Sequence, residues 1–235
     1  MVIQLQLSGQ TDSLTATISG IITGKSAVVG VQITEIETGT SVTLNPEYKY
    51  PLMSVFKLHL GVTVLHAIDE GKLSLEQGVL IKKSDLMENT WSPIRVKYPE
   101  GNVTLSIKEL LHYTIADSDN NGCDILLELI GGTETVQKFI NKQGIKDFVI
   151  KVNEQEMRIW ENLYINTTTP LATTELLEKF YKGKVIKKKS TKYLYQIMVE
   201  CSRGLTWMKA GLPEGTELAH RTGISGTNEN NLRVA

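Results

Sequence analysis

The feature that most constrains this chain is an apolar run in residues 51–71 that opens with the sequence Ser54-x-x-Lys57. The run follows a proline, continues through residues 58–68 and stops at a glycine. An apolar stretch of this length, with a stop signal at its end, predicts one long buried helix. Positions three apart lie on the same face of a helix, so we expect the Lys57 amine within reach of the Ser54 hydroxyl.

A serine beside a buried lysine predicts nucleophilic chemistry. A serine is a weak nucleophile until a neighbouring group takes its proton. Burial in an apolar helix lowers the pKa of a lysine, which lets the amine act as a base. The start of a helix also leaves backbone N–H groups free to stabilise developing negative charge. Because Ser-x-x-Lys is a common pattern, this motif alone is only a hypothesis.

Three further motifs strengthen it: Ser118-Asp119-Asn120, Arg221-Thr222-Gly223, and the polar segment 154–158, which reads Glu-Gln-Glu-Met-Arg. In their order along the chain, with the Glu154 segment between the other two, the four motifs resemble the signature of class A serine β-lactamases and penicillin-binding proteins. The resemblance extends from about Thr11 to the last residue. Segments 89–93 (NTWSP) and 119–124 (DNNGCD) are most similar to the PER- and VEB-type branch of class A.

The resemblance implies an α+β fold of the β-lactamase/transpeptidase type. We expect residues 1–50 and 202–235 to form an antiparallel sheet lobe and residues 51–201 a helical lobe, with the site between them. The family continues past its Lys-Thr-Gly strand with two strands and a closing helix, so we expect a sheet without these elements.

Local patterns agree with this division. Alternating and β-branched residues predict a strand hairpin that joins a larger sheet, and a further strand precedes the Arg-Thr-Gly motif. Helical periodicity dominates between them. The expected strands are 27–36, 41–44 and 217–222, and the expected helices are 54–71, 106–116, 124–130, 133–144, 170–180 and 191–201.

The resemblance also implies roles for residues in the first three motifs. Ser54 is the nucleophile that becomes acylated, and Lys57 is its general base or helps a water to be one. Ser118 passes a proton to the leaving lactam nitrogen, and Asn120 hydrogen-bonds the amide of the substrate side chain. Glu154 activates the water that hydrolyses the acyl-enzyme, a residue that penicillin-binding proteins lack.

Two features of the Glu154 segment need separate attention. Glu156 competes for the role of catalytic acid, but Met157 favours Glu154, because the family has an apolar residue three positions after its glutamate. Arg158 stands where the family has asparagine or histidine. A guanidinium is always charged, so Arg158 could pair with Glu154 and weaken it as a base. We therefore hypothesise that deacylation is slow.

Substrate binding is assigned by resemblance as well. Arg221 replaces the family's lysine and keeps its positive charge for the substrate carboxylate, which Thr222 also binds. The backbone N–H groups of Ser54 and Ile224 form the oxyanion hole. Arg233 loosely matches an arginine that contacts the carboxylate, although a surface arginine explains it equally well. Trp91 matches an aromatic residue at the mouth of the site, where packing of the wall is an equal explanation.

Composition excludes several other classes of function. The net charge of −1 gives no reason to expect nucleic acid or an anionic membrane as partner. The histidines and cysteines lack the spacing of metal ligands, so we expect no metal and no cofactor. Cys123 and Cys201 are the only cysteines, and a bridge between them stays open. The first twenty residues show no signal peptide, but the family is exported, so we expect a periplasmic or secreted monomer.

The sequence therefore predicts a serine hydrolase that opens β-lactams such as penicillins and cephalosporins through an acyl-enzyme on Ser54. Two alternatives remain open at this stage. One is an acyl-enzyme former with little turnover, similar to a penicillin-binding protein. The other is an inactive, C-terminally truncated fragment.

Overall fold

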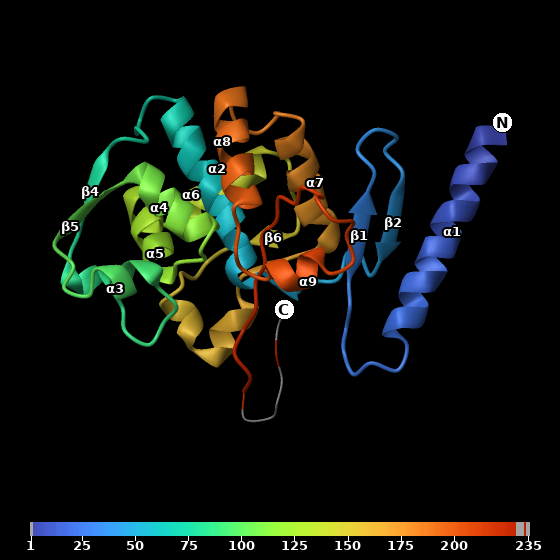
Figure 1. Ribbon diagram of the computed structural model, residues 1–235, viewed down its shortest axis with the longest axis horizontal. Helices are drawn as coiled ribbons and strands as arrows, with labels where there is room; N and C mark the ends of the chain where they lie inside the picture. Colours follow the sequence, from blue (N-terminus) through green and yellow to red (C-terminus); the bar gives the residue numbers. More distant parts are fainter. Residues whose placement is uncertain (1, 229–232, 234–235) are drawn as a thin grey trace.

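The computed structural model describes residues 2–228 and 233 and shows an α+β protein with antiparallel sheets (Figure 1). Most of its helices pack into one body around α2 (Phe56–Asp69), which a short 3₁₀-helix, η1 (Met53–Val55), precedes. The other helices of this body are α3 (Pro93–Lys97), α4 (Ile107–Ile115), α5 (Asn120–Leu129), α6 (Thr133–Lys142), α7 (Pro170–Tyr181) and α8 (Lys188–Val199).

The helices begin where the sequence provides capping side chains. Ser106 and Glu109 form a capping box at α4, in which each side chain accepts a hydrogen bond from the backbone N–H of the other. Thr169 accepts from the N–H of Ala172 at α7, where Pro170 occupies the first turn as expected. The expected helices between residues 54 and 201 are thus confirmed, with boundaries that differ by a few residues.

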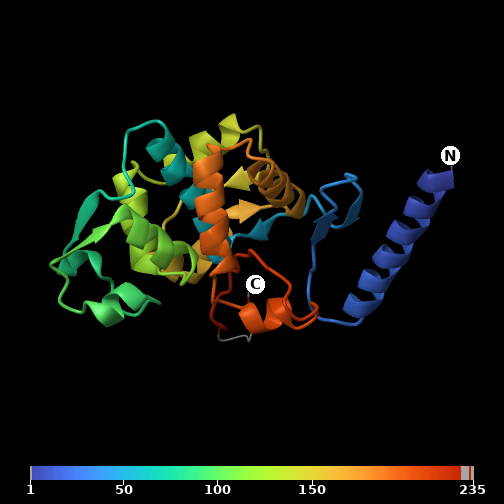
Figure 2. The same ribbon diagram turned by 45° about the horizontal axis from the view of Figure 1, so that its top comes forward.

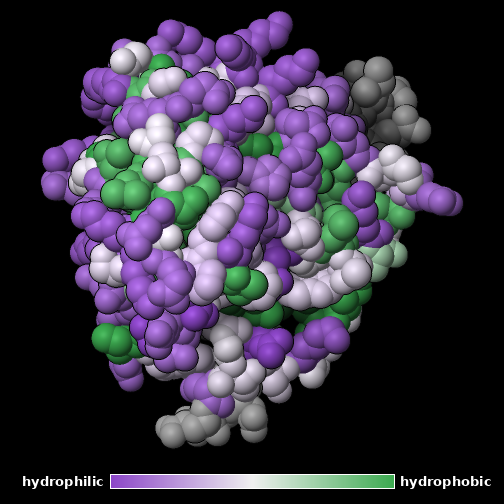
Figure 3. Space-filling model, turned by 60° about the vertical axis from the view of Figure 1, so that its left-hand side comes forward, coloured by the Kyte–Doolittle hydropathy of each residue, from purple (hydrophilic) through white to green (hydrophobic). Residues whose placement is uncertain are grey.

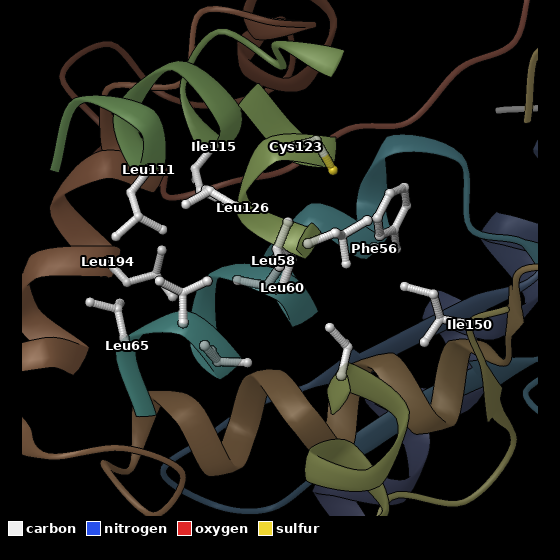
Figure 4. Close-up of a cluster of buried hydrophobic side chains, with 14 of the residues drawn as sticks. Phe56, Leu58, Leu60, Leu65, Leu111, Ile115, Cys123, Leu126, Ile150 and Leu194 are labelled. Carbon is white, nitrogen blue, oxygen red and sulfur yellow. The ribbon is translucent and has the colours of Figure 1, made fainter. Parts of the chain in front are cut away.

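The hydrophobic core surrounds α2, which is buried along most of its length (Figure 4). Phe56, Leu60 and Leu65 project from α2 into a cluster to which α4, α5 and α8 contribute side chains. Because apolar burial is worth about 25 cal/mol per Å², this packing fixes α2 firmly relative to its neighbours. The residues at the start of α2 are therefore held on a rigid support. On the face that carries β4 and β5, hydrophobic residues form separate patches among hydrophilic ones (Figure 3).

The strands form three small antiparallel sheets in the described residues. In the first, the hairpin strands pair from Val31↔Leu44 to Thr34↔Ser41. The second sheet has the order β3-β7-β6, and the third contains β4 and β5. The strands are β1 (Val31–Thr34), β2 (Ser41–Leu44), β3 (Tyr50–Pro51), β4 (Gly78–Ile81), β5 (Val103–Ser106), β6 (Phe148–Val149) and β7 (Thr167–Thr168).

Two of our strand predictions are wrong within the described residues. The hairpin β1–β2 pairs with no further strand there, and residues 217–222 form none. A strand exists only where its backbone is paired with a neighbour. Residues 217–222 instead attach to the end of α8, where the N–H of His220 donates to the carbonyl of Met198. The division into two lobes stays a prediction.

One long helix was not expected from the sequence. Helix α1 (Val2–Ile22) packs along β2 and stands apart from the helical body (Figures 1 and 2). At the other end of the described chain lies a short helix, α9 (Leu205–Lys209). Among the described residues, no helix has both the length and the apolar character needed to cross a bilayer.

Candidate active site

Ser54 lies in η1, immediately before α2. Its backbone follows a residue in an unusual conformation, Met53, and is in close contact with Gly223. Met53, the preceding residue, has a φ of 43°, a left-handed conformation that costs an ordinary residue about 1–3 kcal/mol. Gly223 packs directly against this turn. A Cβ at Gly223 would lie 2.9 Å from the backbone N of Ser54 and 2.8 Å from the carbonyl oxygen of Leu52. The close approach of the two segments therefore requires glycine at position 223.

Lys57 is the centre of the site. Its side chain is completely buried, and its Nζ lies 3.0 Å from the Oγ of Ser54, as the helical spacing predicted. The same Nζ lies 2.6 Å from the Oδ1 of Asn120. It also lies 3.1 Å from the carbonyl oxygen and 3.3 Å from the Oγ of Ser118. Lys57 thus joins the first motif to the second.

Glu154 completes the surroundings of Lys57. Its Oε1 lies 2.7 Å from the Lys57 Nζ, and its side chain is only 8% exposed. Glu156 is exposed instead, and it accepts a hydrogen bond from the N–H of Asn153. Of the two competing acids, Glu154 is the one that the structure brings to Lys57.

Asp124 holds the backbone of the Glu154 segment. Its two carboxylate oxygens accept from the N–H of Glu154 at 2.8 Å and from the N–H of Gln155 at 3.0 Å. Burial raises the pKa of Asp124 to about 7, against the opposing effect of the hydrogen bond from Glu154. A residue on α5 therefore fixes the position of the acid on the loop that follows β6.

The Ser118–Asn120 turn is held by its middle residue. Asp119 is fully buried and accepts from the N–H of Gly122, the N–H of Ile94 and the hydroxyl of Ser92. Ser118 has a φ of 63°, and this left-handed conformation accompanies the two contacts of Ser118 with Lys57. Burial raises the pKa of Asp119 despite its hydrogen bonds.

Arg221 approaches the same turn from the C-terminal segment. Its Nη2 donates to the Oγ of Ser118 at 2.6 Å. Its Nε and Nη1 atoms are buried and have no acceptor among the described residues, and burial lowers the pKa of Arg221. Buried donors without acceptors are costly, so this arrangement suits an anionic ligand. Thr222, the next residue, donates to the carbonyl oxygen of Arg203.

The four motifs thus meet around one buried lysine. Comparison with known proteins identifies the family to which such a site belongs. Residues 13–232 match the β-lactamase enzyme family. The β-lactamase VEB-1 of Pseudomonas aeruginosa is 42% identical over 224 residues, which span 94% of this chain and 75% of the relative.

The chain belongs to the β-lactamase enzyme family. The extended-spectrum β-lactamase PER-1 of Pseudomonas aeruginosa is 37% identical over 222 residues, spanning 94% of this chain and 72% of the relative. Among solved structures, the extended-spectrum β-lactamase TLA-3 superposes with a TM-score of 0.93 at 43% identity, over 95% of this chain and 82% of that chain. A β-lactamase from Chitinophaga pinensis gives 0.86 at 40% identity, over 95% and 80%. This β-lactamase is a class A serine enzyme of the PER and VEB branch.

Not every predicted site residue of this β-lactamase joins the cluster. Arg233 is exposed and donates to the Oγ1 of Thr227, so the structure favours the alternative of a surface arginine. Arg158 is exposed on η3 (Glu156–Arg158), while the ion-pair partner of Glu154 is Lys57. The possible pairing of Arg158 with Glu154 is therefore not formed among the described residues, and slow deacylation stays a hypothesis.

The remaining predicted residues lie around the cluster. Trp91 is about half exposed, with its Nε1 donating to the carbonyl oxygen of Asp117. Ile224 is exposed and follows Gly223, which packs against the Ser54 backbone. Cys123 and Cys201 are both buried and free, so the possible bridge is not formed.

Sequence reasoning missed three residues that shape the site. Asp124 was used only as part of an apolar helix and of the segment that resembles the PER and VEB branch, and Gly223 only as the end of a motif. Arg203 was not considered at all, although its guanidinium lies 4.3 Å from the centre of the Trp91 ring. The run 119–124 contained a signal for Asp124, because an acid within a buried helix needs partners. Among the described residues, no group of three or more histidine, cysteine or acidic side chains is placed to hold a metal ion.

Proposed function

We propose that this β-lactamase opens its substrate through an acyl-enzyme on Ser54, with Lys57 and Glu154 moving the protons. The enzyme hydrolyses β-lactams. The observation that carries the assignment is the position of the Lys57 Nζ, 3.0 Å from the Ser54 Oγ and 2.7 Å from the Glu154 Oε1. One amine therefore touches both the proposed nucleophile and the proposed acid.

Acylation needs a base that takes the Ser54 proton as the Oγ attacks the lactam carbonyl. Transfer of a proton from Lys57 to Glu154 leaves a neutral amine 3.0 Å from the Ser54 Oγ. As the C–N bond of the lactam breaks, its nitrogen needs a proton. The Ser118 hydroxyl is suited to supply it, because its Oγ lies 3.3 Å from the Lys57 Nζ, which can replace that proton.

Deacylation needs a second nucleophile, which is water. Glu154 returns its proton to the neutral Lys57 amine and is then the base for this step, because it is buried and reaches the same lysine as Ser54. It takes a proton from water, and the hydroxide attacks the ester carbonyl. The bond between that carbon and the Ser54 Oγ then breaks as Lys57 donates a proton to the Oγ. The backbone contacts of Asp124 support this role, because they fix the Glu154 segment.

Binding of the substrate rests on the walls of the site. We assign the substrate carboxylate to Arg221, because its Nε and Nη1 have no acceptor among the described residues. We also assign it to Thr222, whose hydroxyl would turn from the carbonyl oxygen of Arg203 to donate to the substrate. The amide of Asn120 lies at the site, and we assign it to the side chain of the substrate. Trp91 has an exposed ring, which we assign to the wall of the site. The backbone N–H groups of Ser54 and Ile224 form the oxyanion hole, supported by the packing of Gly223 against Ser54.

The proposal also covers the location of the protein in the cell and its partners. We infer export to the periplasm or the outside of the cell, supported by the relationship to VEB-1 and PER-1. A monomer that binds neither nucleic acid nor membrane agrees with the net charge of −1.

Ring opening of a chromogenic cephalosporin tests the proposal. We expect the wild-type chain to open many equivalents, and Ser54→Ala to open none above the rate in buffer. Ser202→Ala, at an exposed serine outside the site, is the matched control and should retain full turnover. Hydrolysis by Ser54→Ala at the wild-type rate would rule out Ser54 as the nucleophile.

A further inference from the structure

Arg203 is the second arginine near the proposed carboxylate site, and the mechanism above does not use it. Its guanidinium carbon lies 4.3 Å from the centre of the Trp91 ring. The ring is held in turn, because the Trp91 Nε1 donates to the carbonyl oxygen of Asp117 at 2.8 Å. Asp117 precedes Ser118, so this contact connects Arg203 to the Ser118–Asn120 turn.

The backbone of Arg203 lies beside Thr222, on the side of the site opposite Trp91. Its carbonyl oxygen accepts from the Oγ1 of Thr222 at 3.2 Å and lies 3.0 Å from the Nε2 of His220. Gly204 packs closely against Thr222, since a Cβ at Gly204 would lie 2.9 Å from the Thr222 Cγ2. Arg203 thus starts beside Thr222, and its side chain reaches across to Trp91.

The charge of Arg203 has no counterpart in the described part of the chain. Its side chain is exposed, forms no ion pair there and donates no hydrogen bond to the residues that the structure describes. Stacking on an aromatic ring fixes the plane of a guanidinium while its edge keeps all of its N–H donors. That edge matches the two oxygens of a carboxylate. Arg203 is therefore oriented for an anion that the residues described in the structure do not supply.

We propose that Arg203 is a specificity-determining residue that binds the carboxylate of the β-lactam together with Arg221, and that Trp91 is its positioning residue. This inference rests on the proposed function, which assigns the carboxylate to Arg221 and Thr222. Arg203 takes the part that the sequence suggested for Arg233, whose guanidinium donates to Thr227.

In this proposal the two arginines bind the carboxylate from different depths, since Arg221 is partly buried and Arg203 is exposed. Arg221 is partly buried, and one of its nitrogens is occupied by Ser118, which leaves Nε and Nη1 for one side of the carboxylate. Arg203 lies on the solvent side of Arg221 and binds the other side of the carboxylate. An exposed cation also attracts an anionic substrate from solution, an effect that salt weakens.

A pair of substrates separates charge recognition from other effects. We compare a chromogenic cephalosporin that has its ring carboxylate with the methyl ester of the same compound. Arg203→Ala should raise KM for the acid about tenfold, the effect of losing one charge-assisted hydrogen bond, and change kcat less than about threefold. KM for the ester should stay within about twofold of its wild-type value. Lys209→Ala removes an exposed cation from nearby α9 and is the matched control.

A double-mutant cycle tests the part of Trp91. Trp91→Ala should also raise KM for the acid, and adding Arg203→Ala should then raise it less than about threefold further, because the guanidinium is already free to move. Trp91→Phe keeps a ring under the guanidinium and should restore most of the affinity. Circular dichroism of each variant verifies that the fold is retained.

The outcomes distinguish this inference from the proposed function. An unchanged KM for the acid in Arg203→Ala, or equal increases for acid and ester, would overturn the role of Arg203. Full additivity with Trp91→Ala would overturn the positioning role. The dissociation constant of the acid on Ser54→Ala tests Arg203 without turnover, so it remains decisive if hydrolysis fails. There, Arg203→Ala should weaken binding about tenfold, and unchanged binding contradicts the inference.

Discussion

The Lys57 Nζ lies 2.7 Å from the Oε1 of Glu154, and both side chains are almost completely buried. An ion pair in such a position costs much desolvation energy, and removing one partner leaves an uncompensated charge. A substitution that removes either charge should therefore change both the stability of the fold and the activity of the enzyme.

The first prediction concerns this coupling. Lys57→Met should abolish turnover and lower the free energy of unfolding by about 3–5 kcal/mol, because Glu154 stays buried without its partner. The double variant Lys57→Met/Glu154→Leu should be inactive but more stable than Lys57→Met, since neither charge remains. Urea unfolding of the three proteins at pH 7 measures the difference. A double variant no more stable than Lys57→Met would contradict the explanation by an unpaired Glu154.

Asp124 should give turnover a pH dependence near neutrality. The ionised carboxylate accepts from two backbone N–H groups of the Glu154 segment, and burial raises the pKa of Asp124 to about 7. As the pH falls through 7, protonation removes one acceptor and loosens the segment, so kcat should fall. Asp124→Asn has only one acceptor atom at every pH. It should lower kcat at pH 8 about tenfold and show a flatter profile from pH 6 to 8.

Single-turnover kinetics identifies the step affected by Asp124. We expect slower deacylation in Asp124→Asn, with acylation nearly unchanged. The role assigned to Asp124 fails if this variant keeps the wild-type profile and rate.

Gly223 provides a steric test of the approach between the C-terminal segment and Ser54. Gly223→Ala puts a Cβ 2.9 Å from the Ser54 backbone N and 2.8 Å from the Leu52 carbonyl oxygen, so one segment has to move. We expect kcat/KM to fall by at least about a hundredfold, because misplacement by about 1 Å has an effect of that size.

The matched control for this test is Gly226→Ala, where a Cβ meets nothing within 4 Å. It lies three residues further along the same segment and should leave kcat/KM within about twofold of the wild type. Equal effects of the two substitutions would contradict the steric explanation.

His59 should make the fold sensitive to acid. It is completely buried on α2, its ring stacks on Phe148 with centroids 4.3 Å apart, and burial lowers the pKa of His59 to about 4. As the pH falls below 6.5, the unfolded chain binds a proton that the folded chain does not accept until pH 4. Stability is therefore lost across this window, by about 3 kcal/mol at most.

A substitution isolates the contribution of His59. His59→Leu should show a shallower loss of unfolding free energy between pH 6.5 and 4 in urea titrations. Parallel pH curves for the wild type and His59→Leu would contradict the assignment.

Much of the site could be predicted because its parts are local. The spacing of Ser54 and Lys57 needs only the geometry of a helix, and their 3.0 Å contact follows from it. The helices of the core were predictable for the same reason, since their periodicity and capping residues lie within single segments. The family resemblance supplied the order of the motifs, and the structure brings them to Lys57.

The rest depends on contacts between distant segments. Residues 217–222 have the composition of a strand, but their backbone bonds lead to Met198 and the end of α8. The sequence left open whether Arg158 faces Glu154. Arg158 lies exposed on η3, whereas Glu154 pairs with Lys57. Neither arrangement can be predicted from the local sequence, because both depend on contacts with residues that are distant in the chain.

Intact-mass spectrometry of Glu154→Gln after mixing with a cephalosporin separates the two proposed steps, formation and hydrolysis of the acyl-enzyme. Glutamine keeps the shape of the side chain but can take a proton neither from Lys57 nor from water. Acylation should therefore slow, and hydrolysis of the acyl-enzyme should slow much more, so that the acyl-enzyme accumulates. We predict a lasting adduct of one equivalent, mapped to Ser54 by peptide mass, whereas the wild type returns to its unmodified mass as substrate is consumed. Wild-type turnover by Glu154→Gln without an adduct would contradict the role of Glu154. An adduct on any residue other than Ser54 would contradict the mechanism as a whole.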